Sequence, residues 1–113
     1  MRLYHRTPAG QAILAGGFRD ATGSYMLVGL ELTGVWLSNV PLDSNEGAKG
    51  DDLLEVTFPD GSDLSEFEIV QDGWGYREWC VPAALINATA TVRMLTEEEE
   101  DSIPRDTEGW IGP

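Results

Sequence analysis

The sequence predicts an α+β domain with a small, split and mostly antiparallel β-sheet and one short helix near the N-terminus. Five or six short segments have the β-branched and aromatic content of strands, whereas only one segment has convincing helix signals. Strands and helices do not alternate regularly, which argues against a doubly wound parallel sheet. The length of 113 residues suits one hydrophobic core. Together these observations indicate a single compact domain.

The first strand and the helix are predicted at the N-terminus. Arg2–Arg6 alternates side chains as a short strand does. Thr7 followed by proline is typical of an N-cap and the first turn of a helix, which continues through Gln11–Ala15. The Gly-Gly pair at positions 16–17 ends this helix.

The middle of the chain contains one buried strand between less regular segments. Phe18–Gly23 is predicted as an irregular polar loop, and Tyr25–Leu32 suits either a strand or a packed loop. Gly34–Ser38 has the composition of a buried strand. Pro41–Asp52 is rich in Asp, Ser, Asn and Gly, which predicts a loop or a single helical turn.

The second half of the chain supplies the remaining strands. Leu53–Phe58 is a strong strand prediction, closed by the turn sequence Pro-Asp-Gly at positions 59–61. Leu64–Gln71 alternates in part and could pair with that strand. Arg77–Val81 is another apolar strand, Pro82–Ile86 a single turn introduced by proline, and Thr89–Leu95 a closing strand. We therefore expect a folded domain over residues 1–95 and a solvated acidic tail over residues 96–113.

The chain is strongly acidic, with 20 Asp and Glu residues against 7 Lys and Arg residues and a formal net charge of −13. The negative electrostatic potential of such a chain repels phosphate backbones, so general nucleic-acid binding is disfavoured and a basic protein is a more natural partner. An acidic interaction protein, such as an inhibitor of a basic partner, is therefore one alternative function.

The cysteine content and the absence of several known motifs argue against other classes of protein. The single Cys80 cannot form an internal disulfide, which suits a reducing compartment. The sequence has no apolar run long enough to span a membrane and no signal-peptide stretch, so we expect no membrane partner and a cytoplasmic protein. The chain contains no P-loop and no G-x-G-x-x-G, G-x-S-x-G or H-E-x-x-H motif. Its aspartates lack the spacing of metal ligands, so no metal is expected.

Two titratable residues are the first candidates for catalysis. His5, the only histidine, lies at the end of the first strand and can donate or accept a hydrogen bond while neutral; its simpler role is to cap the sheet edge. Glu78 lies near the start of the strand predicted at Arg77–Val81, where alternation places Tyr76, Glu78 and Cys80 on one face. A partly desolvated carboxylate needs a partner or a task, so an ion pair with an arginine and a catalytic role both stay open.

Three segments combine such residues with predicted buried strands. They are His5-Arg6-Thr7 followed by a helix and Gly17-Phe18, then Gly34-Val35-Trp36-Leu37 followed by Ser44, and finally Glu78-Trp79-Cys80-Val81-Pro82. In this order they resemble motifs of the ADP-ribosyltransferase superfamily. The similarity is greatest to its histidine–tyrosine–glutamate branch, which contains the poly(ADP-ribose) polymerases and diphtheria toxin and has the RNA 2′-phosphotransferases as relatives. The resemblance covers roughly residues 3–95 and implies an ADP-ribosyltransferase-like fold.

The resemblance implies that the chain binds NAD as its substrate. His5 would contact the adenine-side ribose, and Thr7 would support the first strand. Trp36 would stack on the nicotinamide, and Ser44 would bind the nicotinamide carboxamide. Glu78 would hold the 2′-hydroxyl of the nicotinamide ribose, near the positive charge that develops when the glycosidic bond breaks.

Arginines would supply the positive charge that an acidic protein needs to hold NAD. Arg6 or Arg19 would meet the pyrophosphate. The implied activity is transfer of ADP-ribose to an unknown protein or nucleic-acid acceptor, or hydrolysis of NAD, with Glu78 and His5 as the catalytic residues. Arg6 replaces the family's usual glycine and Trp36 its tyrosine, so an NAD-binding module without turnover is an alternative.

Overall fold

The computed structural model describes residues 1–25, 30–42, 50–69 and 76–103. Its elements are β1 (Arg2–Thr7), α1 (Gly10–Gly16), β2 (Ala21–Tyr25), β3 (Leu30–Ser38), β4 (Asp52–Thr57), the 3₁₀ turn η3 (Ser65–Phe67), β5 (Glu68–Ile69), β6 (Glu78–Val81), α2 (Ala83–Thr89), β7 (Thr91–Leu95) and α3 (Glu97–Asp101). Within these ranges no helix is long and apolar enough to cross a membrane.

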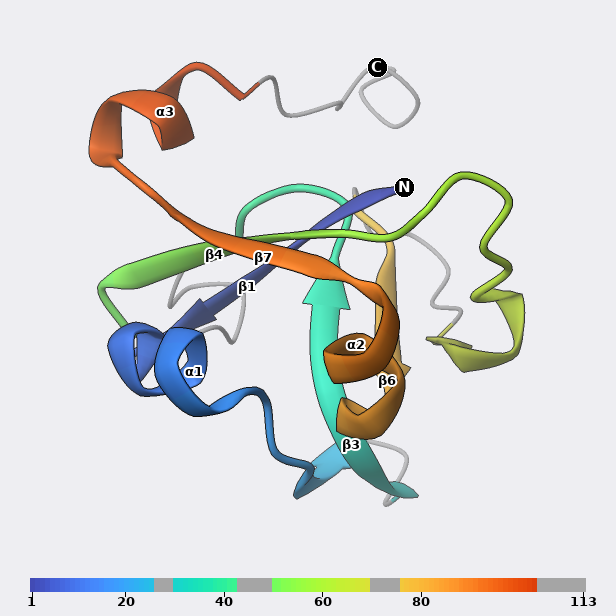
Figure 1. The fold of residues 1–113 in the computed structure, drawn as a ribbon. Helices are drawn as coiled ribbons and strands as arrows, with labels where there is room; N and C mark the ends of the chain where they lie inside the picture. The colour runs from blue at the N-terminus through green and yellow to red at the C-terminus, as the bar shows by residue number, and fades with distance from the viewer. Residues whose placement is uncertain (26–29, 43–49, 70–75, 104–113) are drawn as a thin grey trace, which may run out of the picture.

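The strands form a small antiparallel sheet in the order β5-β6-β3-β1-β4-β7, and β2 pairs with β3 outside this row. The predicted α+β class and the mostly antiparallel pairing are therefore confirmed. β1 pairs with β4 along its whole length, but its ladder with β3 contains only the pair Tyr4 and Ser38. The sheet is thus split between β1 and β3, and Figure 1 shows β3 running across the direction of β1, β4 and β7.

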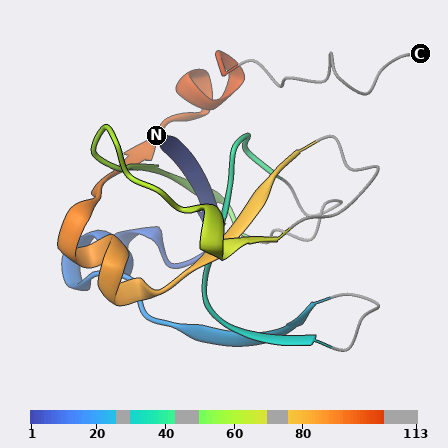
Figure 2. The same cartoon turned by 90° about the vertical axis from the view of Figure 1, so that its right-hand side faces the viewer.

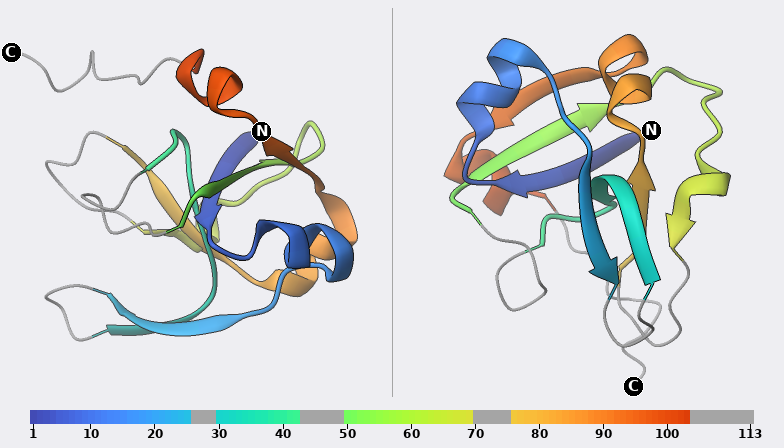
Figure 3. Two further views of the ribbon diagram at one scale, coloured as in Figure 1. Left: turned by 90° about the vertical axis from the view of Figure 1, so that its left-hand side faces the viewer. Right: turned by 90° about the horizontal axis from the view of Figure 1, so that it is seen from below.

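The main core lies on one face of the sheet. Register places Leu3, Leu54 and Val56 on the same face of β1 and β4, and all three are almost fully buried. Trp79 and Val81 of β6 are also buried in this core, as alternation in that strand predicts. Helices α1 and α2 lie together on one side of the sheet, whereas α3 lies apart from them (Figures 2 and 3).

A second, smaller apolar cluster lies on the opposite face. Tyr4, Leu53 and Leu95 are buried there, and Ile103, just beyond α3, packs against them. Residues 97–103 were expected to belong to a solvated tail. Helix α3 forms there without a buried residue, as in a solvated segment, and Ile103 after it packs against this apolar cluster.

Four expectations about local structure differ from what the structure shows. Thr7 is the last residue of β1 and not the N-cap of α1, which begins at Gly10 after Ala9. Residues 21–23, expected in a loop, belong to β2 because they pair with β3. Leu64–Gln71 offered a possible partner for the strand at Leu53–Phe58, but its short strand β5 pairs with β6. The proline-initiated turn at residue 82 extends into the helix α2.

Candidate functional site

A pocket of about 410 Å³ lies between α1, the segment that follows it and β3. Three of the residues singled out from the sequence line it: His5 from β1, Arg19 from the segment after α1, and Trp36 from β3. The structure therefore brings together residues that are far apart in the chain. The volume lies within the range of small-molecule sites in proteins.

His5 links the two halves of the split sheet. Its Nδ1–H donates to the carbonyl oxygen of Trp36 at 2.7 Å, so a side chain replaces the backbone ladder where β1 and β3 separate. Because a carbonyl only accepts, the proton lies on Nδ1, and Nε2 of the neutral ring is an acceptor. Burial lowers the pKa of His5 below its usual value, although the bond to Trp36 opposes this shift. The imidazole is therefore neutral near pH 7.

The chain after α1 is held in place by contacts with α2. Gly17 ends the helix with φ of 88°, a conformation that glycine adopts without strain. Asn87 of α2 accepts from the Phe18 N–H and donates to the Phe18 carbonyl, both at 2.9 Å. The buried Phe18 ring meets the edge of the His5 ring, with centroids 5.3 Å apart. These contacts fix one wall of the pocket and place Arg19 beside it.

Arg6 follows His5 in β1 and lies on the opposite face of the strand, because neighbouring residues in a strand point to opposite faces. Its guanidinium forms an ion pair with Glu100 of α3, and its Nε–H donates to the Leu42 carbonyl. The Arg6 side chain is only 11% exposed. Arg6 is therefore occupied by the C-terminal helix and does not line the pocket, which leaves Arg19 there.

Thr7 and Ser44 are the remaining candidate residues from the first two motifs. Thr7 is buried, and its Oγ1 accepts from the Ala9 N–H at 3.0 Å, which fixes the turn from β1 into α1. Ser44 lies outside the described residues.

Glu78 is half-buried at the start of β6, opposite Ser38 of β3. Register places Glu78, Ser38 and Tyr4 on one face of the sheet, whereas His5 is on the face that carries the main core. Glu78 is not among the described lining residues of the pocket. Its neighbour on the same face, Cys80, has its pKa raised by burial and by the nearby Asp20 carboxylate, so the thiol is protonated and weakly nucleophilic near pH 7.

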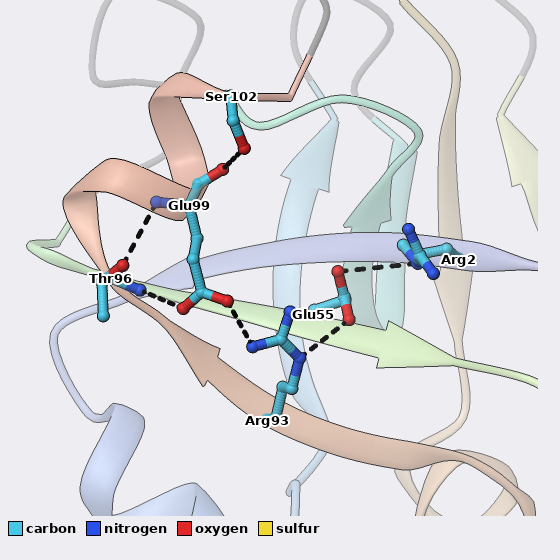
Figure 4. A network of polar contacts seen from close by, with 6 residues as sticks. All are labelled: Arg2, Glu55, Arg93, Thr96, Glu99 and Ser102. Carbon is cyan, nitrogen blue, oxygen red and sulfur yellow. Dashed lines mark hydrogen bonds and ion pairs between the residues drawn. The ribbon is translucent and has the colours of Figure 1, made fainter.

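The acidic segment at the C-terminal end is attached to the sheet by a polar network (Figure 4). Thr96 caps α3, with its side chain accepting from Glu99 N–H while the Glu99 carboxylate accepts from Thr96 N–H. Arg93 donates to Glu99 at 2.7 Å and to Glu55 at 3.2 Å, and Arg2 lies 3.5 Å from Glu55. Local carboxylates thus neutralise the arginines on this face.

Two contacts that position the site, and one that holds Arg6 away from it, were not expected from the sequence. Asn87 holds Phe18, Glu100 holds Arg6, and the ring of Phe18 orients His5. For one of these residues, Glu100, the sequence contains a local signal: Thr96 and Glu99 have the spacing of a capping box, which indicates the start of helix α3. The other contacts join elements distant in the chain, and no local pattern indicates them.

Comparison of the chain with protein-family models, with curated proteins and with solved structures finds no match. Within the described part of the chain, no group of three or more His, Cys, Asp or Glu side chains gathers in a way that could hold a metal ion. The geometry of the pocket and its surroundings therefore carries the functional argument.

Proposed function

We propose that the protein is an NAD-consuming enzyme that transfers ADP-ribose to an acceptor or hydrolyses NAD to nicotinamide and ADP-ribose. One observation carries this proposal. The three segments that resemble ADP-ribosyltransferase motifs lie on β1, β3 and β6, which are neighbours in the sheet, and the pocket beside them is lined by His5 and Trp36. Residues from separate parts of the chain thereby meet at one small-molecule-sized cavity.

The chemistry requires groups that stabilise the transition state more than the bound substrate. Cleavage of the nicotinamide glycosidic bond develops positive charge on the ribose, and a fixed carboxylate such as Glu78 would lower that barrier. Trp36 offers an aromatic surface that orients the leaving nicotinamide at low entropic cost. His5, neutral and held by the Trp36 carbonyl, offers an acceptor for a substrate hydroxyl.

The split of the sheet gives these groups a way to act on one substrate. His5 and Glu78 lie on different faces, but β1 and β3 pair only at Tyr4 and Ser38. A substrate bound where the strands separate would reach His5 from one side and the face of Glu78 from the other. The proposal therefore requires both residues to affect the same reaction.

The test measures nicotinamide release from NAD, together with NAD binding, for the wild type, His5→Ala and Glu78→Gln. Glu66→Gln is the matched control, because it neutralises an exposed carboxylate of η3. We expect wild type and Glu66→Gln to release nicotinamide, and Glu78→Gln to bind NAD but release about 100-fold less. Circular dichroism spectra establish that each variant is folded. Absence of NAD binding in the wild type would refute the proposal.

A second candidate is a module that binds NAD without consuming it. One observation favours it: Glu78 is not among the described residues that line the pocket. Of the expected site residues, the described lining contains His5, Arg19 and Trp36. The same experiment separates the two functions. The second candidate predicts that wild type and Glu78→Gln bind NAD equally and that neither releases nicotinamide.

A further inference from the structure

We propose that the outer edge of β7 is a binding site for an extended, basic segment of another protein, which adds to the sheet as a further antiparallel strand. Residues of β7 are not among the described residues that line the pocket with His5 and Trp36. Strand addition at this edge is therefore a property separate from the proposed function. Three features of the structure support it: the backbone of β7, the side chains along its edge and the charge beside its C-terminal end.

The strand β7 ends the row of strands, with β4 on one side of it. The register with β4 is continuous from Thr91, which pairs with Thr57, to Leu95, which pairs with Leu53. Among the described residues, β4 alone forms backbone hydrogen bonds with residues 91–95. The strand at the opposite end of the row, β5, is only two residues long, so β7 is the longer of these two edges.

The hydrogen bonds between β1 and β4 show which backbone groups the edge of β7 presents. The Met1 ammonium group donates to the Phe58 carbonyl at 3.1 Å, and the Phe58 N–H donates to the Met1 carbonyl at 2.8 Å. Residues along an antiparallel strand direct their N–H and C=O groups alternately to the neighbours on the two sides. Because Phe58 faces β1, Thr57 faces β7, and so does every second residue of β4 before it.

The same alternation in β7 leaves two residues whose backbone groups point away from β4. Thr91 pairs with Thr57 and therefore faces β4, so the N–H and C=O groups of Val92 and Met94 point to the outer edge. A row of such groups is a template on which another strand can pair through main-chain hydrogen bonds.

The side chains of β7 leave this edge without the usual protection against pairing. The strand contains no proline and no bulge, and Glu55 and Glu99 hold the Arg93 guanidinium over the face of the sheet. On the other face Val92 and Met94 are half-buried and pack against the main core. Apolar side chains of an added strand would cover the rest of these two residues.

The charge beside β7 favours a basic segment. Helix α3 begins two residues after β7 and contains only acidic residues, Glu97–Asp101. Two of them pair with arginines, whereas Glu97, Glu98 and Asp101 form no ion pair with the described residues. Three carboxylates next to the C-terminal end of the strand therefore attract lysine or arginine.

The same charge disfavours a second copy of this chain at the edge, because two chains of net charge −13 repel each other. All strand pairs described in the sheet are antiparallel, and an antiparallel guest would place its N-terminal end beside α3. We therefore expect lysine or arginine at the N-terminal end of the segment, followed by apolar residues at the two positions opposite Val92 and Met94.

Peptides selected from a display library of random 12-residue sequences, with the full chain as target, are the probes. Calorimetric titration measures their affinity. Methylation of one backbone nitrogen at a time along a selected peptide tests strand addition without any change to the protein, because only every second peptide N–H would face β7.

Three variants of the protein locate the site. Val92→Pro removes an N–H from the outer edge and keeps the hydrogen bonds to β4. The double variant Glu97→Gln with Glu98→Gln removes two carboxylates of α3. Its control, Asp60→Asn with Glu66→Gln, removes the same charge from exposed positions outside β7 and α3.

We expect the enriched peptides to be basic and N-methylation to weaken their binding at least about tenfold at alternate positions only. Val92→Pro should also weaken binding about tenfold. The double variant of α3 should weaken binding about threefold at low salt, and its control should bind as the wild type does.

Several results would overturn the proposal. They are a library without binders, a loss on N-methylation that does not alternate, unchanged affinity of folded Val92→Pro, or equal affinity of the α3 variant and its control. If Val92→Pro does not fold, the N-methylation series still decides. A wild-type dimer in light scattering that Val92→Pro dissociates would show that a second copy occupies the edge, which would overturn the assignment to a basic segment.

Discussion

The ion pair between Arg6 and Glu100 gives the most direct test of how the C-terminal helix is held. Glu100→Gln removes the carboxylate charge with little change of shape, so that the buried Arg6 guanidinium keeps neutral acceptors, the new amide oxygen and the Leu42 carbonyl, but loses its ion pair. The Arg6 side chain is 11% exposed and that of Glu100 is 30% exposed. The pair is therefore intermediate between a surface ion pair and a buried one.

These exposures set the expected size of the effect. Exposed pairs contribute about 0.2–1 kcal/mol, whereas removing one partner of a buried pair costs about 3–5 kcal/mol. For this intermediate case we expect Glu100→Gln to lower the free energy of unfolding by about 2 kcal/mol, which corresponds to a fall in Tm of about 8 °C for a domain of this size. The loss is specific to the contact with Arg6, because removing an acid from a chain of charge −13 otherwise relieves repulsion.

Urea denaturation followed by tryptophan fluorescence measures this effect. Glu98→Gln is the control, because it removes the same charge from an exposed position of the same helix, and it should change stability by no more than about 0.5 kcal/mol. A double-mutant cycle with Arg6→Met isolates the pair, with an expected coupling of about 1–2 kcal/mol. The reasoning is refuted if Glu100→Gln and Glu98→Gln have the same stability, or if the coupling is zero.

Three further substitutions test other parts of the structure. Gly17→Ala should destabilise the fold by about 1–2 kcal/mol, because φ is 88° and the new Cβ would lie 3.0 Å from Asn87 Oδ1. The control Gly16→Ala places its Cβ where nothing lies within 4 Å, so it should stabilise the fold by about 0.5 kcal/mol. Thermal unfolding measures both changes. Burial lowers the pKa of His5, so the unfolded chain binds more protons below about pH 6.5 and stability falls as the pH falls through that value. His5→Asn should lack this component, and equal pH profiles of unfolding for variant and wild type would contradict the burial argument. Ile103→Ala should cost about 1 kcal/mol, because this side chain packs partly buried against the cluster under α3; an unchanged urea midpoint would show that the contact contributes nothing.

Local sequence signals predicted the elements whose structure is decided locally. The Gly-Gly pair ended α1 at residue 16, and the mostly apolar run at residues 53–58 gave β4 within one residue at each end. Alternation in β6 correctly separated Trp79 and Val81 from Glu78 and Cys80. In each case the cause, a chain conformation or a pleat, lies within a few residues of the pattern.

Elements that depend on distant partners were not predicted. Gly23 and Ser24 have low strand propensity, and they belong to β2 because Leu32 and Glu31 of β3 pair with them. The short strand β5 could have paired with any neighbouring edge, and only the three-dimensional arrangement assigns it to β6. The helix α3 had a capping signal at Thr96, but its docking depends on Arg6 at the other end of the chain.

The candidate site likewise combines features that are decided locally with others that depend on distant partners. This combination determines how nicotinamide release by the His5 and Glu78 variants is interpreted. Residue types and order made His5, Trp36 and Glu78 the candidates, but whether His5 and Glu78 share a face depends on register. Tyr4 pairs with Ser38, and Ser38 with Glu78, so a slip of one residue between β1 and β3 would bring His5 to the face of Glu78. If His5→Ala and Glu78→Gln both abolish nicotinamide release while NAD binding and the fold are kept, the result supports a substrate that reaches both faces where β1 and β3 separate. If only one of them does, the reaction takes place on the face of that residue.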